Sequence, residues 1–317
     1  MKRVGHSRSK DLPAEFRERL SEICSPEIIS AVHQGMAQPR PLTVRMNILR
    51  CPRMEILAAL RSAGIMARPL PWYEDALIVD SVQDESLEGL SAKGWLYRQG
   101  LASMLPPLVL DPHPGQRILD LCAAPGSKTS QLAALMRNQG TILAVEAVRK
   151  RYYKLKSVCD LLGVTNAQFR CQDGRHLRPE DGDFDRILVD APCSSEGRFR
   201  LDEPKTFGYW SLRKIREMAR KQRGLLLSAA RRLLPGGTLV YSTCTFAPEE
   251  NEGTVDWVLR KTAGQLRVVP ISLAGVPTYP CLSSWNDREY DPQVRGCLRV
   301  APGDAMEGFF LARLERE

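Results

Sequence analysis

The stretch Asp120-Leu121-Cys122-Ala123-Ala124-Pro125-Gly126-Ser127-Lys128 decides the fold of this 317-residue chain. An apolar run at residues 117–121 predicts a buried strand before the turn, and residues 127–136 predict the helix that follows it. The small residues of the turn allow a ligand to approach the backbone and the amino terminus of the helix. The stretch therefore predicts a strand–turn–helix unit with a ligand site at its turn. The glycine pattern of dinucleotide-binding folds is absent from it.

Strands and helices continue to alternate after this unit, which predicts a parallel sheet with crossover helices. Four further strands are predicted, at residues 141–146, 168–171, 184–190 and 238–242. The longest helix is predicted at residues 211–234. Residues 296–300 and 308–314 predict an antiparallel pair at the edge of the sheet. We therefore expect an α/β domain over residues 93–317.

A smaller unit is predicted in front of this domain, over residues 1–92. Its first part, residues 13–38, predicts short helices, because apolar residues recur there at helical spacing: Phe16, Leu20 and Ile23. A strand, a helix and a second strand are predicted after it, at residues 42–49, 54–62 and 76–81. The first of these strands carries Arg45 and Asn47, and a solvated strand face would account for both. The pattern indicates a small α/β unit.

The charge of the chain favours a polyanionic partner. Its 45 Lys and Arg residues exceed its 37 Asp and Glu residues, which gives a net charge of +8. Basic surface attracts phosphate backbones, because binding releases their counterions. We therefore expect a nucleic acid as the partner.

The composition argues against a membrane protein, a secreted protein and a metal site. No apolar run approaches the ~20 residues that span a bilayer, and the basic first residues lead into no signal-peptide core. The nine cysteines form no C-x-x-C pair, and the four histidines show no metal-ligand spacing. We therefore expect a cytoplasmic, monomeric protein with reduced thiols, no bound metal and no membrane partner.

Polar or reactive side chains follow each predicted parallel strand of the main domain. In chain order they are Lys128, Glu146, Asp173, Asp190 with Cys193, and Cys244. Ligands of open α/β sheets bind beyond the carboxyl ends of the strands, so we expect these side chains to line one site. A carboxylate in the position of Glu146 can accept both ribose hydroxyls of a nucleoside. Asp173 is placed to meet an adenine amino group or to cap the turn that follows it.

Two cysteines, Cys193 and Cys244, compete for the role of nucleophile at this site. A thiolate becomes reactive where positive charge lowers its pKa, and Lys128 at the same sheet edge can supply that charge. Carbon 5 of cytosine is a poor nucleophile until a group adds to carbon 6, and a thiolate can make that addition. Asp190 can hold the amidine edge of the base, and Cys193 or a water can take the carbon 5 proton. Residue chemistry alone leaves the choice between the two thiols open.

Several motifs together resemble the RNA 5-methylcytosine methyltransferase family, which includes bacterial RsmB and RsmF and the eukaryotic Nop/Sun proteins. They span nearly the whole chain: Arg45-Met46-Asn47, residues 120–129, Asp190-Ala191-Pro192-Cys193, Ser242-Thr243-Cys244-Thr245, Glu249-Glu250-Asn251-Glu252 and Gly308-Phe309-Phe310. Residues 190–252 are most similar to RsmF-like enzymes. The resemblance implies a Rossmann-like class I methyltransferase core, with a mostly parallel sheet and an antiparallel edge. It also implies that the preceding small α/β unit is RRM-like and contacts RNA.

The resemblance further implies the roles of the site residues. It assigns S-adenosylmethionine binding to Cys122, Ala123, Ala124, Pro125, Gly126, Ser127, Lys128, Glu146, Arg151, Asp173 and Asp190. Cys244 is similar to the nucleophile of the family, and Cys193 to the cysteine that helps release the methylated product. A DNA cytosine methyltransferase would instead use the Pro-Cys thiol, Cys193. Ser127 and Ser195 depart from the family pattern, which often has glycine at both positions.

Two basic stretches are candidates for RNA binding. Residues 149–156 combine cations with Tyr152 and Tyr153, which suits phosphates and stacked bases, although an ordinary solvated helix face has the same pattern. The predicted helix 211–234 carries a second cationic face, formed by Arg213, Lys214, Arg216, Arg220, Lys221 and Arg223. We expect S-adenosylmethionine-dependent cytosine-5 methylation of RNA, with ribosomal RNA ahead of transfer RNA as the target. The alternative from another class is a non-catalytic RNA-binding or ribosome-assembly factor on the same fold.

Overall fold

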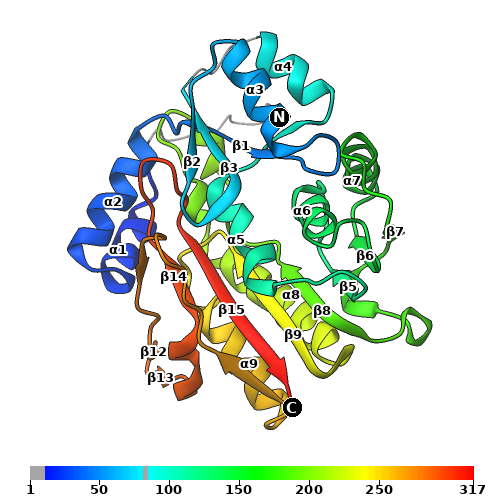
Figure 1. Ribbon diagram of the computed structural model, residues 1–317. Helices are drawn as coiled ribbons and strands as arrows, with labels where there is room; N and C mark the ends of the chain where they lie inside the picture. The colour runs from blue at the N-terminus through cyan, green and yellow to red at the C-terminus, as the bar shows by residue number, and fades with distance from the viewer. Residues whose placement is uncertain (1–10, 81–84) are drawn as a thin grey trace, which may run out of the picture.

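The computed structural model describes residues 11–80 and 85–317, which form a small sheet, a large sheet and the helices around them (Figure 1). The small sheet is antiparallel with the strand order β2-β3-β1-β4. Its strands are β1 (Leu42–Met46), β2 (Ala67–Leu70), β3 (Tyr73–Val79) and β4 (Leu96–Arg98). Two helices pack on its apolar face, α3 (Arg53–Ser62) and α4 (Glu85–Ala92). The predicted small α/β unit is therefore present.

The strands of this unit differ from the prediction in several places. β1 ends at Met46, three residues before the predicted end, and β4 was not predicted. β2 was not predicted, and β3 begins at Tyr73, three residues before the predicted start. The predicted end of that strand, at residue 81, lies outside the described residues. β4 pairs with β1 although it lies beyond residue 92, so the division of the chain at that residue stays a prediction.

The predicted amino-terminal helices are α1 (Ala14–Ile23) and α2 (Pro26–Ala37). Their apolar face does not pack on the small sheet. Phe16 and Leu20 instead join a buried cluster with Phe199, Phe207 and Phe246, which come from the main domain. Figure 1 shows these helices beside β14 (Leu298–Val300), away from α3 and α4. The helices therefore support the segments that follow two strands of the large sheet.

The large sheet has the strand order β11-β14-β15-β9-β8-β5-β6-β7, and β10 also pairs with β15. Its remaining strands are β5 (Arg117–Asp120), β6 (Thr141–Glu146), β7 (Ala167–Cys171), β8 (Phe184–Asp190), β9 (Leu233–Thr243), β10 (Leu266–Val269), β11 (Thr278–Tyr279) and β15 (Phe309–Arg316). The five strands from β7 to β9 are parallel, and the others add to them antiparallel. A separate hairpin pairs β12 (Ser284–Trp285) with β13 (Arg288–Glu289). The predicted Rossmann-like sheet is therefore present.

Helices cover both faces of the large sheet, because alternate strand residues point to opposite faces. In β5, Leu119 packs toward the side of α8 (Leu212–Ala230) and α9 (Glu252–Thr262), whereas Ile118 packs toward α5 (Leu101–Leu110) and α6 (Ser127–Leu135). The helix α7 (Arg149–Leu161) packs on β6. Within the described residues, no helix combines the length and apolarity needed to cross a bilayer.

The predicted carboxy-terminal strand pair forms and belongs to the antiparallel edge of the sheet, where β11 is the outermost strand. β15 pairs with β9 on one side and with β14 on the other, and β11 lies beyond β14. Both faces of β15 are apolar and buried, since Phe310 packs on one side of the sheet and Phe309 and Leu311 on the other. A strand buried on both faces belongs in the interior of a sheet. The predicted long helix also ends early, at Ala230, because β9 begins at Leu233.

Arg45 and Asn47 do not form a solvated strand face; both are fully buried. Arg45 donates from Nη2 to Ser130 Oγ in α6 at 2.7 Å. Asn47 donates from Nδ2 to the carbonyls of Gly94 and Leu162, at 2.7 and 2.9 Å. These bonds reach the helix that follows the first turn and the end of α7. The small sheet is thus anchored to the main domain through its own strand.

Candidate active site

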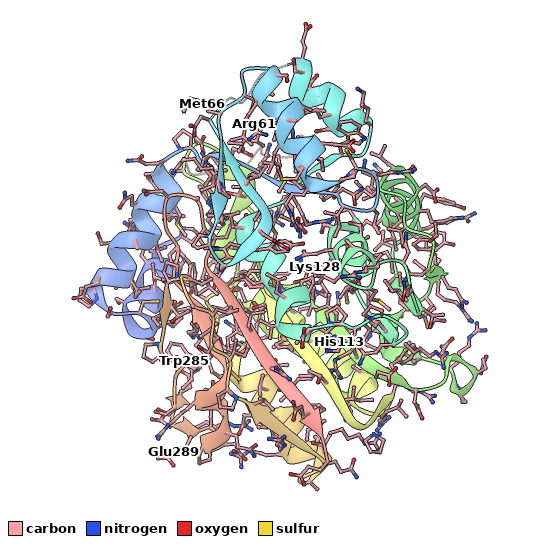
Figure 2. All side chains as sticks on the ribbon, in the orientation of Figure 1. Arg61, Met66, His113, Lys128, Trp285 and Glu289 are labelled. Carbon is pink, nitrogen blue, oxygen red and sulfur yellow. The ribbon has the colours of Figure 1, made fainter. Side chains whose placement is uncertain are left out.

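A cavity of about 600 Å³ lies at the carboxyl ends of the parallel strands. The chain leaves β5 toward β6 and β7 and later returns to β8 and β9 on the other side, so β5 and β8 flank the topological switch point. All predicted site residues except Gly126 line this cavity. Figure 2 labels one of them, Lys128, in the middle of the molecule between the small sheet and the large sheet. The side chains that follow the parallel strands therefore line one cavity, as the sequence predicts.

Gly126 shapes the first turn without lining the cavity. Its φ of +109° lies in the left-handed region, which favours glycine. A Cβ atom built there would be 3.2 Å from Val158 Cγ1 and 3.3 Å from Leu155 Cδ1, both in α7. The glycine therefore allows the turn to pack against α7 and places the amino terminus of α6 at the cavity.

Glu146 and Asp173 occupy one end of the cavity, after β6 and β7. Glu146 accepts the backbone N–H of Val148 at 2.9 Å, and its other carboxylate oxygen lies 3.4 Å from Arg151 Nη1. Arg151 also donates to the carbonyl of Ala124 at 2.8 Å, so it links the carboxylate to the first turn. These contacts leave carboxylate lone pairs that can accept further donors.

Asp173 has the capping role considered from the sequence, and it also faces the cavity. It lines the cavity, and it also caps the short 3₁₀ helix Gly174–His176 by accepting the backbone N–H of Arg175 at 3.0 Å. The Arg175 guanidinium donates to both carboxylate oxygens as well. These hydrogen bonds lower the pKa of Asp173 to about 2. Asp173 is therefore a fixed anionic acceptor at neutral pH.

Lys128 and Asp190 form an ion pair at the centre of the cavity. Lys128 Nζ lies 2.7 Å from Asp190 Oδ2 and donates to Ser103 Oγ at 2.7 Å. Ser242 Oγ donates to the other oxygen of Asp190 at 2.8 Å. The carboxylate is thus held in one orientation from two sides. The positive charge of Lys128 is committed to this pair, which differs from the expectation that it would serve the thiols.

The two cysteines meet beside this ion pair. Cys193 Sγ lies 3.3 Å from Cys244 Sγ, although the residues are far apart in the sequence. Ser195 Oγ lies 3.8 Å from the first sulfur and 3.7 Å from the second. Ser195 has a φ of +61°, in the left-handed region that favours glycine. The serine thus brings a hydroxyl group to both sulfurs.

The electrostatic surroundings of the two thiols are unequal. The hydrogen bond from Cys193 and the nearby Arg198 guanidinium lower the pKa of Cys244. The hydrogen bond to Cys244 and burial raise the pKa of Cys193 well above its usual value, and the Glu250 carboxyl adds to this rise. Cys244 is therefore the thiol that loses its proton first. Arg198 was not predicted, because its distance from the motifs along the chain follows no recognised spacing.

Buried carboxyl groups brace the two loops that carry the thiols. Glu196 accepts the N–H of Trp210 at 2.7 Å, the hydroxyl of Thr245 at 2.8 Å and the backbone N–H of Phe246 at 3.0 Å. Glu196 follows Cys193, whereas the donors Thr245 and Phe246 follow Cys244. One side chain therefore joins both loops. Burial raises the pKa of this carboxyl.

The Glu-Glu-Asn-Glu motif of residues 249–252, to which the sequence assigned no role, supports the same loops. Glu250 accepts the backbone N–H of Ser194 at 3.0 Å and the amide of Gln222 at 2.7 Å, and burial raises its pKa to about 8. Asn251 donates to the carbonyl of Thr245 at 2.9 Å. These contacts fix the backbone on both sides of the sulfur pair.

Glu307 closes the thiol end of the cavity. Its carboxylate lies 3.1 Å from Arg40 Nη1 and 3.5 Å from Arg198 Nε. The adjoining backbone is tightly packed, because a Cβ atom on Gly197 would lie 2.1 Å from the carbonyl of Gly308. The wall beside Cys244 therefore combines two arginines with one carboxylate.

Comparisons with known proteins agree with this arrangement. Residues 107–315 match the family model described as 16S rRNA methyltransferase RsmB/F, and residues 13–84 match the ferredoxin-like domain model of RsmF/B-like methyltransferases. A solved structure described as a methyltransferase homolog from Pyrococcus horikoshii superposes with a TM-score of 0.80 and 27% identity. That superposition covers 96% of this chain and all of the other.

Two curated relatives show how much of each protein is shared. The tRNA (cytosine(49)-C(5))-methyltransferase of Pyrococcus abyssi is 36% identical over 313 residues, which is 97% of both chains. Ribosomal RNA small subunit methyltransferase F of Cronobacter sakazakii is 36% identical over 321 residues. This chain spans only 64% of that enzyme, although 94% of the chain is aligned. With these matches, the chain belongs to the RsmB/F methyltransferase family.

Proposed function

We propose that this protein transfers a methyl group from S-adenosylmethionine to carbon 5 of a cytosine in RNA, through a covalent adduct with Cys244. One observation carries the proposal. Two thiols whose pKa values are shifted in opposite directions share a cavity with Glu146, a carboxylate placed to accept ribose hydroxyls. A non-catalytic RNA-binding factor would have no need of an activated thiol beside such a site.

The residues at the other end of the cavity fit S-adenosylmethionine. The lone pairs of Glu146 can accept ribose hydroxyls, and the anionic Asp173 can accept an amino group. The small side chains of Ala123 and Ala124 leave room beside the amino terminus of α6. A volume of about 600 Å³ lies in the range of small-molecule sites. When bound, this cofactor supplies the methyl group.

The thiols and Asp190 divide the remaining chemistry. The Cys244 thiolate adds to carbon 6 of the cytosine, which makes carbon 5 nucleophilic enough to take the methyl group. Asp190, fixed by Lys128 and Ser242, accepts hydrogen bonds from the amidine edge of the base. Loss of the carbon 5 proton to a base then expels the Cys244 thiolate and restores the ring. Cys193 is proposed to assist this release.

Ribosomal RNA is the proposed target. Transfer RNA is a second candidate, because the aligned region covers 97% of the tRNA methyltransferase from Pyrococcus abyssi. Transcripts of both classes, together with DNA of the same sequence, belong in one methyl-transfer assay. We expect methylation of RNA and none of DNA. Bisulfite sequencing of cellular RNA with and without the gene would then identify the cytosine.

Two cysteine variants test the mechanism. We expect Cys244→Ala to abolish methyl transfer, and Cys193→Ala to accumulate a protein–RNA adduct that survives denaturing electrophoresis. Cys171→Ala is the matched control, because this exposed cysteine does not line the cavity and should keep full activity. Full turnover by Cys244→Ala would contradict the assignment of the nucleophile. Failure of the wild-type protein to bind S-adenosylmethionine in a calorimetric titration would contradict the enzyme function itself.

A further inference from the structure

A second, open groove lies beside the candidate active site, on the side of the small sheet. It has a volume of about 320 Å³ and is lined by residues 40–43 and 98–100. The last three of these residues, Arg98, Gln99 and Gly100, also line the 600 Å³ cavity. The two hollows therefore adjoin along this segment, and the groove is open on the side of β1 and β4.

The groove meets the cavity at the end that holds the thiols. A Cβ atom built on Gly100 would lie 3.5 Å from Glu307 Oε1, so the shared wall touches the carboxylate. Glu307 contacts Arg40, which lines the groove, and Arg198, which lines the cavity near Cys244. Glu146 and Asp173 follow β6 and β7, which lie on one side of β5. The two thiols follow β8 and β9, which lie on its other side. An RNA strand in this groove would thus approach the thiols without crossing the end of the cavity that holds Glu146 and Asp173.

The charge of the groove suits a phosphate backbone. Its cations are Arg40 and Arg98, and Arg198 stands where the groove joins the cavity. Arg40 and Arg198 share one carboxylate, that of Glu307, which leaves an excess of positive charge. Arg98 lies 3.9 Å from the exposed Glu88, which is a loose ion pair, and its own side chain is 49% exposed. A pair of this kind contributes little stability, so a phosphate can replace the carboxylate.

We propose that this groove binds the backbone of the unpaired RNA strand next to the target cytidine, with Arg98 as its phosphate contact. This inference rests on the proposed function. The target base must leave its stack to reach Cys244, so the adjoining nucleotides have to be held outside the cavity. The groove adjoins the thiol end of the cavity, and it is cationic. Arg98 thus positions the strand and takes no part in the bond-forming steps.

The Arg98→Ala variant tests the proposal with three measurements on unmodified tRNA and 16S rRNA transcripts. They are steady-state methyl transfer, filter binding between about 50 and 300 mM KCl, and calorimetric titration with S-adenosylmethionine. Loss of a charge-assisted phosphate contact should raise the KM for RNA roughly five- to fifty-fold. The slope of log affinity against log salt should fall by about 1. Cofactor affinity and kcat at saturating RNA should stay at wild-type values.

Two further variants make the result specific. Arg98→Lys keeps the charge, so it should retain the wild-type salt slope. Arg178→Ala is the matched control. This arginine is 62% exposed and lies 3.7 Å from Glu180, which lines a hollow at the starts of β5 and β6, at the opposite end of the strands from the cavity. It should leave every value unchanged. Arg98→Ala with a wild-type KM and salt slope, or equal losses in Arg178→Ala, would overturn the proposal.

The test separates this inference from the proposed function. If the wild-type protein methylates RNA and Arg98→Ala behaves like the wild type, only the groove assignment is wrong. If the wild-type protein methylates no RNA, the proposed function is wrong. In that case the filter-binding slopes still report whether Arg98 contacts phosphate.

Discussion

The buried ion pair between Glu252 and Arg299 gives a stability prediction with a defined size. Arg299 donates from Nε and Nη2 to the two carboxylate oxygens of Glu252 at 2.6 and 2.7 Å. Its Nη1 donates to the carbonyl of Phe246 at 3.0 Å, two residues after Cys244. Both charged side chains are at most 1% exposed. The Arg299→Met variant therefore leaves a carboxylate without water and without its cation.

Removing one partner of such a pair costs about 3–5 kcal/mol of unfolding free energy. For a chain of this size, that loss lowers Tm by roughly 4–8 °C. Urea unfolding followed by circular dichroism measures the free energy, and scanning calorimetry measures Tm. The exposed pair of Arg267 with Glu315 provides a control, because Arg267→Met should cost less than about 1 kcal/mol.

The double variant Glu252→Leu with Arg299→Met decides whether the unpaired charge causes the loss. With both charges replaced by apolar side chains, at least half of the stability lost in Arg299→Met should return. A double variant as unstable as the single variant would refute the reasoning. The packing of the arginine stem, and not its charge, would then account for the effect.

Two pH-dependent predictions follow from the shifted groups near the thiols. Arg198→Gln removes a positive charge that lowers the pKa of Cys244, so the rise of the single-turnover rate with pH, at saturating RNA, should move to higher pH. Coincident profiles for the variant and the wild type would contradict this role. Glu250 has a pKa raised to about 8 by burial, whereas an unfolded glutamate ionises near pH ~4.3. Between these values the folded state holds a proton that the unfolded state has lost, so this group's stabilisation is full at low pH and falls as pH rises toward 8. Glu250→Gln should flatten that fall in urea unfolding at pH 5 to 8, and an unchanged slope would show that the carboxyl is already ionised.

The main domain could be predicted from the sequence because its signals are local. The strands at residues 141–146 and 184–190 were predicted with the bounds that the structure has, since each is a short apolar run between turn residues. The chemistry-bearing side chains follow these strands directly, and parallel strands bring their carboxyl ends to one edge. Their assembly around one cavity was therefore predictable.

The parts that escaped prediction depend on contacts between distant segments. Arg45 looked like a surface residue, because a charged side chain in a strand is usually solvated; only the docking of β1 on α6 buries it. Arg198 and Glu307 are far apart in the chain, and only the packing of Gly197 on Gly308 brings them together. The choice of Cys244 over Cys193 came from the family resemblance. The residue types near each cysteine do not decide between the two, because the pKa values of the two thiols depend on charges from three separate segments.

The burial of Arg45 and Asn47 has a consequence for how substrates are selected. Their hydrogen bonds hold β1 against α6 and α7, so the groove between the small sheet and the thiols has walls of fixed separation. A groove with fixed walls does not close around the RNA that it binds. The work of unstacking and turning a cytidine outward then falls on the RNA, and it is smallest in loops and bulges. We therefore expect the protein to discriminate among RNAs by how readily a site deforms, as much as by the bases that it displays.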